Sequence, residues 1–393
     1  MASQLLKEFR VHNFKLLLNV TFSPSKVNLL IGKNNTGKTS LCQAMKFLSR
    51  STMMDLKECV GATSGIPQAL PHNALLGETT KLGLKARLLF DGVEYDFDYD
   101  LAIRDCSRDQ GTPQMEVVHE TLHVSGGKYT NMCLLSNDEN GVKLLHEVEF
   151  AEGNVRYAET YAPRDATMLK ILYDVRTNRL AHLFKTYLRF WCYYSLNPTQ
   201  IRSFIPRPDD LVLAEDGSNL ASMLHRLKSA NERDYRELLK HVNLFDPSID
   251  AVNFFTSAGL IAMTFADSSD RRVMALNSSN GTLQFLAILY VLLAQPKIIG
   301  IPSLFMIEEP ENGIFVGELR KLVQLADMSP NNTQIIFTTH SPYLIDLFDN
   351  KLDGVFVMKR DETHAYIRQP DQQIVDKYLG EHPLGQLYFQ GLL

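Results

Sequence analysis

GKNNTGKT, from Gly32 to Thr39, is the stretch that decides the fold. The apolar run KVNLLI precedes it and predicts a buried strand, and SLCQAMKFL after it has the spacing of a helix. The stretch matches the pattern G-x-x-x-x-G-K-[ST], in which glycines let backbone N–H groups curl around a phosphate at the start of a helix. Strand, loop and helix in this order therefore predict a phosphate-binding loop in an α/β protein.

The side chains of this loop predict that the protein binds ATP and Mg²⁺. Lys38 suits the β- and γ-phosphate oxygens as a point charge, and the Thr39 hydroxyl suits Mg²⁺. The other nucleotide-binding candidates are Gly32, Asn34, Asn35, Thr36, Gly37 and Ser40. The alternative is a glycine-rich turn with no ligand, which the strand and helix on either side disfavour.

Two neighbouring acids end a second apolar run, SLFMIEEPENGIF, from Ser303 to Phe315. Adjacent carboxylates at the end of a buried strand are costly unless a cation satisfies them. A Mg²⁺–nucleotide complex would do so, with Glu308 at the metal and Glu309 polarising the attacking water. The alternative is an exposed acidic turn before Pro310.

A histidine ends a third apolar run, TQIIFTTH, at His340. A lone histidine is usually structural. At the end of a strand in a phosphate-loop sheet, however, an imidazole can hydrogen-bond both the γ-phosphate and the attacking water. Lys38, Glu309 and His340 are therefore the predicted catalytic residues.

Composition limits the class of protein. The chain has 393 residues and a net charge of −5, so it carries no overall basic field, although a local basic face for nucleic acid remains open. The five cysteines are scattered without a C-x-x-C pair, which fits a reducing cytoplasm. The N-terminus lacks an apolar signal core, and FLAILYVLLA is too short to cross a membrane and is predicted to be a buried helix. We expect a cytoplasmic protein without membrane contact.

The pattern along the chain predicts the arrangement of elements. Alternating apolar residues on either side of Asp91-Gly92 predict a hairpin, and further alternation over 116–124 and 142–150 predicts a small antiparallel sheet. Gly, Pro, Ser and Thr over 51–80 predict a loop, and residues 165–244 have helical spacing. LIAMTF, SLFMIEE and TQIIFTTH read as central strands of a mostly parallel sheet.

Four segments follow from this pattern. Residues 1–50 form the first part of the nucleotide-binding core, and 51–160 form a loop and the antiparallel β subdomain. Residues 161–250 form a helical lid or insertion, and 251–393 form the second part of the core.

The order GKNNTGKTS, SSNGTLQFL, IEEPENG and TTHSP resembles the ABC-type ATPases of the SMC/RecF/OLD group. More narrowly, it resembles the compact bacterial SMC-like proteins labelled AAA-family ATPases. The similarity spans nearly the whole chain, from FRVHNFK near the start to LGQLYFQGLL at the end, which is similar to that group's G-x-L-W-x-x-G-L-L ending. The resemblance implies a P-loop NTPase of the ABC head type.

The resemblance also gives a role to a polar loop before an apolar helix. In ABC-type ATPases, a signature loop contacts the γ-phosphate bound to the other subunit, and here Ser279, Asn280, Gly281 and Thr282 match that loop. Composite sites in a homodimer or higher even oligomer are implied, with Ser279 and the Gly281 amide as contacts. Asn280 departs from the usual acid, which puts the strength of ATP-driven association in doubt. The alternative is a plain helix N-cap.

Three functions of different class remain. The first is an ATP-hydrolysing switch that controls a separate effector, a nuclease or toxin, in bacterial antiphage defence. We expect a separate effector because only about fifty residues follow His340 and no long coiled coil or zinc hook occurs. The second is a RecF-like DNA-repair clamp, and the third is an ATP-bound scaffold that barely hydrolyses.

Two further sets of residues are weaker candidates. Arg10 and Phe14 suit contact with the adenine, because the first strands of this family lie near the base. A basic set in the helical segment suits a partner- or DNA-facing lid or, slightly better, a solvated helix face. Its members are Arg226, Lys228, Arg233, Arg236 and Lys240.

Overall fold

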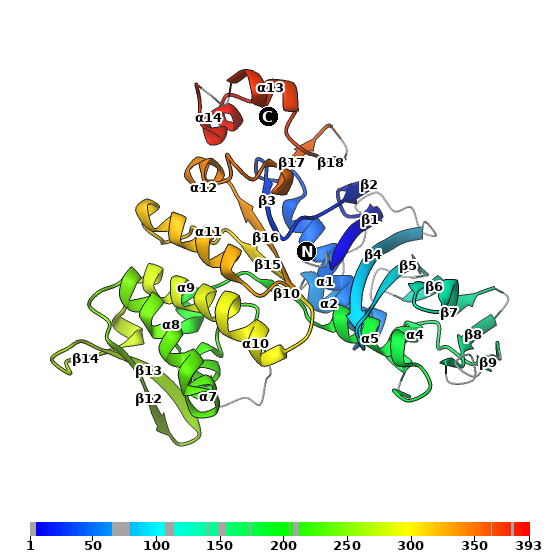
Figure 1. Cartoon of the computed structure of the whole chain (residues 1–393), viewed down its shortest axis with the longest axis horizontal. Coiled ribbons are helices and arrows are strands. Elements are labelled where there is room, and N and C mark those ends of the chain that lie inside the picture. The colour runs from blue at the N-terminus through cyan, green and yellow to red at the C-terminus, as the bar shows by residue number, and fades with distance from the viewer. Residues whose placement is uncertain are drawn as a thin grey trace. The chain divides into compact units, whose positions relative to one another are not determined.

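The computed structural model describes residues 5–64, 79–106, 114–139, 141–147, 155–172, 174–203, 205–206, 212–362, 364–378 and 381–393. The chain forms two compact units, each built from several segments (Figure 1). Unit 1 comprises Met1–Ser25, Gly32–Trp191 and Phe356–Arg368, and unit 2 comprises Lys26–Ile31, Cys192–Val355 and Gln369–Leu393. The strand before the phosphate loop therefore belongs to unit 2, and the loop itself to unit 1.

Unit 1 is built on a long, mainly antiparallel ladder in the order β18-β2-β1-β4-β5-β6-β7-β8-β9. Its strands are β1 (Leu6–Phe14), β2 (Leu17–Phe22), β4 (Thr79–Phe90), β5 (Val93–Asp105), β6 (Met115–Gly126), β7 (Tyr129–Asp138), β8 (Gly141–Leu145), β9 (Tyr157–Thr160) and β18 (Ala365–Arg368). The predicted hairpin is confirmed: Phe90 pairs with Val93 across a turn in which Asp91 and Gly92 have φ of 49° and 78°. Both positive angles are what a two-residue type I′ turn requires.

The helices of unit 1 are α1 (Lys38–Ser51), α2 (Leu56–Ser64), α4 (Met168–Ile171) and α5 (Arg179–Arg189). Helix α1 confirms the prediction from SLCQAMKFL. Helix α2 was not predicted, because it falls within the stretch read as a loop from its composition, and residues 65–78 of that stretch lie outside the described residues. Its buried Leu56, Cys59 and Val60 show that an apolar face holds this short helix in place.

Unit 2 contains the parallel sheet that carries the acidic pair. Strand β3 (Val27–Ile31) pairs in parallel with β16 (Thr333–Thr339), which pairs in parallel with β15 (Ser303–Glu308). Every residue of β3 and β16 is buried, as the continuous apolar runs predicted. Strand β10 (Trp191–Tyr194), three residues of which belong to this unit, lies next to β15, within a stretch that had been predicted to be helical.

The prediction that LIAMTF is a central strand of this parallel sheet is wrong. It forms β13 (Leu260–Ala266), which pairs antiparallel with β12 (Ala251–Ser257), β11 (Ile205–Pro206) and β14 (Arg272–Met274) in a separate sheet. A short apolar run has the same periodicity in either kind of sheet, so the run alone could not decide between them. The partner strand β12 is exposed over its last residues, as expected for a sheet with one solvated face.

Besides these strands, unit 2 contains α-helices. They are α6 (Pro198–Ile201), α7 (Leu220–Ala230), α8 (Glu232–Phe245), α9 (Asn280–Leu289), α10 (Gln295–Ile299), α11 (Leu319–Met328), α12 (Pro342–Asp346), α13 (Gln372–Tyr378) and α14 (Leu384–Phe389). A π-helical turn, Tyr290–Ala294, joins α9 to α10. In the described part of the chain, this run of 20 residues is the one helix long and apolar enough to cross a membrane, and 78% of its most apolar window is buried in the protein. The prediction that it is a buried helix is confirmed.

Candidate active site

The phosphate loop in unit 1 has a backbone that needs glycine. Gly37 has a φ of 98°, and a Cβ on Gly32 would lie 2.5 Å from the Thr36 hydroxyl oxygen and 2.6 Å from the Met358 carbonyl oxygen. The Thr36 hydroxyl donates to the Lys33 carbonyl at 2.8 Å, which closes the turn. The loop therefore has the tight curl that backbone N–H groups need in order to surround a phosphate.

Lys38 begins α1 and is buried in this loop. Its Nζ donates to the carbonyl oxygens of Gly32 at 2.7 Å and Lys33 at 3.0 Å, so the ammonium group lies against the loop itself. No side chain caps α1 and its first turn holds no acid, which leaves the helix N-terminus suited to an anion. Thr39, Asn34 and Asn35 are exposed, whereas Ser40 is buried.

Glu308 ends β15 in unit 2 with an unsatisfied oxygen. Its Oε1 is buried and has no hydrogen-bond partner among the described residues. A buried carboxylate oxygen in this state is costly, and a cation would satisfy it. Magnesium is usually held by one or two carboxylates together with waters and phosphate oxygens. The described residues contain no cluster of three or more potential ligands that could hold a metal by themselves, so Glu308 fits an ion that arrives with a nucleotide.

Glu309 and His340 are brought together at the carboxyl ends of two neighbouring parallel strands. His340 Nε2 lies 3.2 Å from Glu309 Oε1. Glu309 has a φ of 42°, which lies in the left-handed region that residues other than glycine rarely adopt. Its N–H donates to the Thr338 carbonyl at 2.9 Å, and Asn312 Nδ2 donates to its Oε2 at 2.8 Å. The left-handed backbone at Glu309 and the contacts with His340 and Asn312 fix the position of the carboxylate.

A third acid, Glu311, lies behind this pair and was missed in the sequence. The Thr339 hydroxyl donates to the Glu311 carboxylate and accepts from the Ser341 N–H at 2.9 Å. Burial raises the pKa of Glu311, against the opposing effect of the Thr339 hydrogen bond. These bonds tie the turn after β15 to the residues on both sides of His340. The only sequence signal was a third acid in EEPE.

The signature loop lies at the start of α9 in unit 2. Ser279 Oγ accepts from the Thr282 N–H at 3.0 Å, so Ser279 is the N-cap of this helix, as the plain alternative required. Ser279 and Asn280 are nevertheless exposed, and a cavity of about 400 Å³ opens beside Ser279 and Thr282. A Cβ on Gly281 would lie 2.2 Å from the Gly313 carbonyl oxygen, so this glycine packs against the turn that follows the acidic pair.

Arg202 contacts the signature loop and was also missed. Its Nη2 donates to Asn280 Oδ1 at 2.5 Å and reaches the Ser278 carbonyl at 3.4 Å. The guanidinium places a positive charge beside the exposed Ser279. The contact joins residues that are 78 positions apart, so no local pattern could have indicated it.

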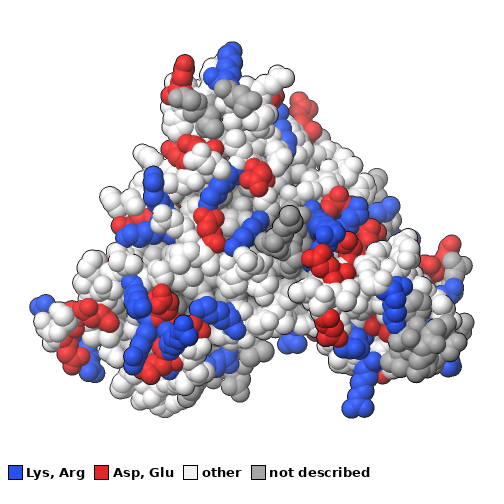
Figure 2. Space-filling model, viewed as in Figure 1, with Lys and Arg blue, Asp and Glu red and all other residues white. Residues whose placement is uncertain are grey.

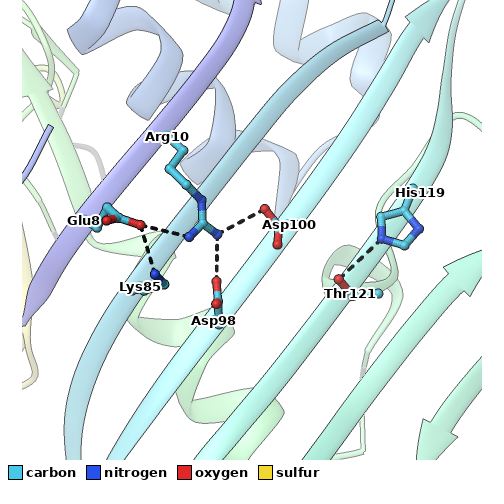
Figure 3. Close-up of polar contacts among 7 residues, drawn as sticks. All are labelled: Glu8, Arg10, Lys85, Asp98, Asp100, His119 and Thr121. Carbon is cyan, nitrogen blue, oxygen red and sulfur yellow. Dashed lines mark hydrogen bonds and ion pairs between the residues drawn. The ribbon is translucent and has the colours of Figure 1, made fainter. Parts of the chain in front are cut away.

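Of the two adenine candidates, Phe14 is not placed as the sequence suggested, and Arg10 is held in ion pairs. Phe14 is fully buried and packs against Phe47, with ring centroids 6.1 Å apart, so its faces are not available to a base. Arg10 lies on the sheet of unit 1, between Glu8 of its own strand and two carboxylates of β5, the next strand but one (Figure 3). It contacts Glu8 at 2.9 Å, Asp98 at 2.7 Å and Asp100 at 3.1 Å. Burial by itself would lower the pKa of Arg10, but the neighbouring carboxylates outweigh burial and raise the pKa.

The acids that accompany the basic set of α7 and α8 lie on α8, whereas α7 carries no acid. Arg236 pairs with Glu232 at 2.7 Å and Lys240 pairs with Glu237 at 3.0 Å, all on exposed side chains. On the face shown in Figure 2, basic and acidic side chains are likewise mixed. This arrangement is typical of a solvated helix face, which was the favoured interpretation.

Comparison with known proteins places these features in a family. Residues 125–346 match a family model described as "AAA domain, putative AbiEii toxin, Type IV TA system", and residues 5–163 match an "AAA ATPase domain". A Helicobacter pylori protein described as "ATP/GTP phosphatase" is 21% identical over 397 residues, covering 96% of each chain. An SMC head bound to the C-winged helix domain of ScpA superposes with a TM-score of 0.53 at 10% identity, covering 95% of this chain and 99% of that one.

The last comparison confirms the predicted α/β architecture as that of an ABC-type ATPase head. The first family model covers more than half of the chain, and the second covers the phosphate loop. The chain is an ATPase and belongs to the AAA-domain family described as putative AbiEii toxin of a type IV TA system.

Proposed function

We propose that this ATPase is a switch whose nucleotide sites are completed by a second copy of the chain, and that it controls a separate effector protein. The observation that carries the hydrolytic part is the 3.2 Å contact of His340 Nε2 with Glu309 Oε1 at the ends of neighbouring strands. The family description, with its reference to a toxin, supports the link to defence. A cytoplasmic location is part of the same proposal.

Each predicted residue has a role in this proposal. The phosphate loop, from Gly32 to Ser40, holds the phosphates, with Lys38 leaving its two carbonyl partners to meet them. Thr39 and Glu308 would hold Mg²⁺, which neutralises phosphate charge when bound. Glu309 accepts a proton from the attacking water, and His340 orients that water and the γ-phosphate.

The surface of unit 2 supports a second copy as the partner at the site. Ser279 is exposed at a helix N-terminus, where an incoming phosphate would be favoured. Large apolar side chains are also exposed just after the acidic pair and just after His340: Phe315 is 75% exposed and Tyr343 59%. Tyr and Phe side chains are enriched in the cores of protein–protein interfaces. We infer that Ser279–Thr282 complete the site of the other protomer.

The effector is proposed to be a separate nuclease or toxin. The similar SMC head was solved with a domain of another protein, ScpA, bound to it. That complex supports the idea that a head of this fold can bind a separate protein. We propose the same relation here, with a different partner.

Molar mass in solution tests the composite site. The Glu309→Gln variant should bind ATP without hydrolysing it, so its mass should double on addition of Mg·ATP. Adding Ser279→Arg should abolish the doubling, because the long cationic side chain blocks the signature loop from the other protomer's phosphate. Ser229→Arg, at an exposed serine near the end of α7, is the matched control and should leave the doubling intact. A mass that ignores ATP in the Glu309→Gln variant would refute the nucleotide-dependent dimer.

A further inference from the structure

The C-terminal helix α14 packs on α12, the short helix that begins two residues after His340. In Figure 1, α14 (red) lies beside α12 (orange). Both helices belong to unit 2. The end of the chain therefore contacts the element that follows a predicted catalytic residue.

Two hydrogen bonds fix the start of α14 on the α12 segment. The Gly385 N–H donates to Asp346 Oδ1 at 2.8 Å, and the Leu384 N–H donates to Asp349 Oδ1 at 3.0 Å. The first N–H groups of a helix have no partner within the helix, so these carboxylates satisfy groups that would otherwise be unpaired. The two hydrogen bonds therefore fix where the first turn of α14 lies on the α12 segment.

Gly385 makes the closest approach between the two helices. A Cβ at this position would lie 2.2 Å from the Pro342 carbonyl oxygen and 2.6 Å from Asp346 Oδ1. Leu384 and Leu387 are fully buried, as are Leu344 and Ile345 on α12. Only a residue without a side chain allows this packing.

The last residues hold α14 in place from its other end. Gly391 has a φ of 77°, and the Leu392 N–H donates to the Leu387 carbonyl at 3.0 Å, which closes the helix. The chain then turns back, and Leu393 is only 2% exposed. The ending LGQLYFQGLL is therefore a packed structural element.

We propose that α14 is a positioning element for His340. His340 lies between β16, which the parallel sheet holds, and α12, which α14 holds. By holding α12, the C-terminal helix keeps the imidazole within reach of Glu309. This inference rests on the proposed role of His340 in hydrolysis.

The test substitutes Gly385→Val in the full-length protein. The added methyl groups would push against the Pro342 carbonyl and displace α12. We expect kcat to fall on the order of tenfold, because small displacements of catalytic groups are costly. The Kd for a non-hydrolysable ATP analogue should stay unchanged, since the phosphate loop is not touched. Gln386→Ala, an exposed position on the same helix, is the matched control and should behave as wild type.

A double-mutant cycle separates positioning from general damage. If Gly385 acts through His340, Gly385→Val should not further slow the His340→Ala variant. The same tenfold loss in that background would overturn the proposal. If His340→Ala alone turns over ATP at the wild-type rate, the proposed role of His340 fails instead. Should Gly385→Val not fold, Asp346→Ala removes the Gly385 acceptor without adding atoms. Wild-type kcat in that folded variant would also overturn the proposal.

Discussion

Asn312 is the residue whose removal tests how Glu309 is held. Its side-chain amide donates to Glu309 Oε2 at 2.8 Å, opposite the oxygen that faces His340. Asn312→Ala should free the carboxylate to rotate and lower kcat on the order of tenfold, with the KM for ATP unchanged. Steady-state kinetics measure both values. Asn331→Ala, at an exposed asparagine with only a 3.5 Å contact from Lys26, should leave both unchanged. A raised KM with normal kcat would instead assign Asn312 to nucleotide binding.

The positions of single residues were predictable where an apolar strand ends. Glu308, Glu309 and His340 follow apolar runs, and the parallel sheet brings the ends of such runs to one edge. Asn312 and Arg202 were not predictable from the sequence. The contact of Asn312 depends on the left-handed backbone at Glu309. The contact of Arg202 with Asn280 joins distant parts of the chain.

At the scale of elements, a buried acid ties strand β6 to helix α4 and makes stability depend on pH. Glu120 accepts from the Met168 N–H at 2.6 Å, the Leu169 N–H at 3.2 Å and the Tyr99 hydroxyl at 2.9 Å. Burial outweighs these bonds and raises the pKa of Glu120 from 4.5 to about 7. The native state thus keeps a proton that the unfolded chain has already released. Stability should therefore fall as pH rises from about 4.5 to 7, by roughly 3 kcal/mol, and level off above that range.

Urea midpoints between pH 4.5 and pH 8 measure this effect. The Glu120→Gln variant should lack this part of the pH dependence, so the difference from wild type isolates it. Glu116 on the same strand is a control of opposite sign, because the Arg104 hydrogen bond lowers the pKa of its carboxyl. Its stabilising effect should be present at neutral pH and lost only as pH falls below about 4.5, so this control extends the urea series to lower pH, where Glu116→Gln should remove the loss. Identical pH profiles for wild type and Glu120→Gln would contradict the prediction.

Elements with strict periodicity were predicted, and those fixed by tertiary contacts were not. The β4–β5 hairpin follows from alternation around Asp91-Gly92, and β3 and β16 follow from continuous apolar runs. Helix α2 was hidden in a stretch of loop-like composition, and β13 was assigned to the wrong sheet. A strand sequence specifies a buried face more firmly than it specifies a neighbour.

At the scale of the whole molecule, the proposed composite site predicts that two inactive variants restore activity when mixed. Lys38→Ala disables the phosphate loop of its own protomer, and Ser279→Arg disables the signature loop offered to the other. In a mixed dimer, one site joins the intact phosphate loop of the Ser279→Arg protomer to the intact signature loop of the Lys38→Ala protomer. The other site carries both defects.

A mixed dimer keeps one intact site that ATP can close, so turnover should appear only in the mixture, and pairing at random would give about a quarter of the wild-type rate. Each variant alone should be nearly inactive, and recovery should require exchange of protomers. Mixing Lys38→Ala with Glu309→Gln is the matched control. Both changes affect the same protomer's half of a site, so in the mixed dimer one site lacks Lys38 and the other lacks Glu309. No recovery is expected there. Wild-type turnover by Ser279→Arg alone would mean that each protomer hydrolyses ATP with its own residues, and that Ser279 serves only as the cap of α9.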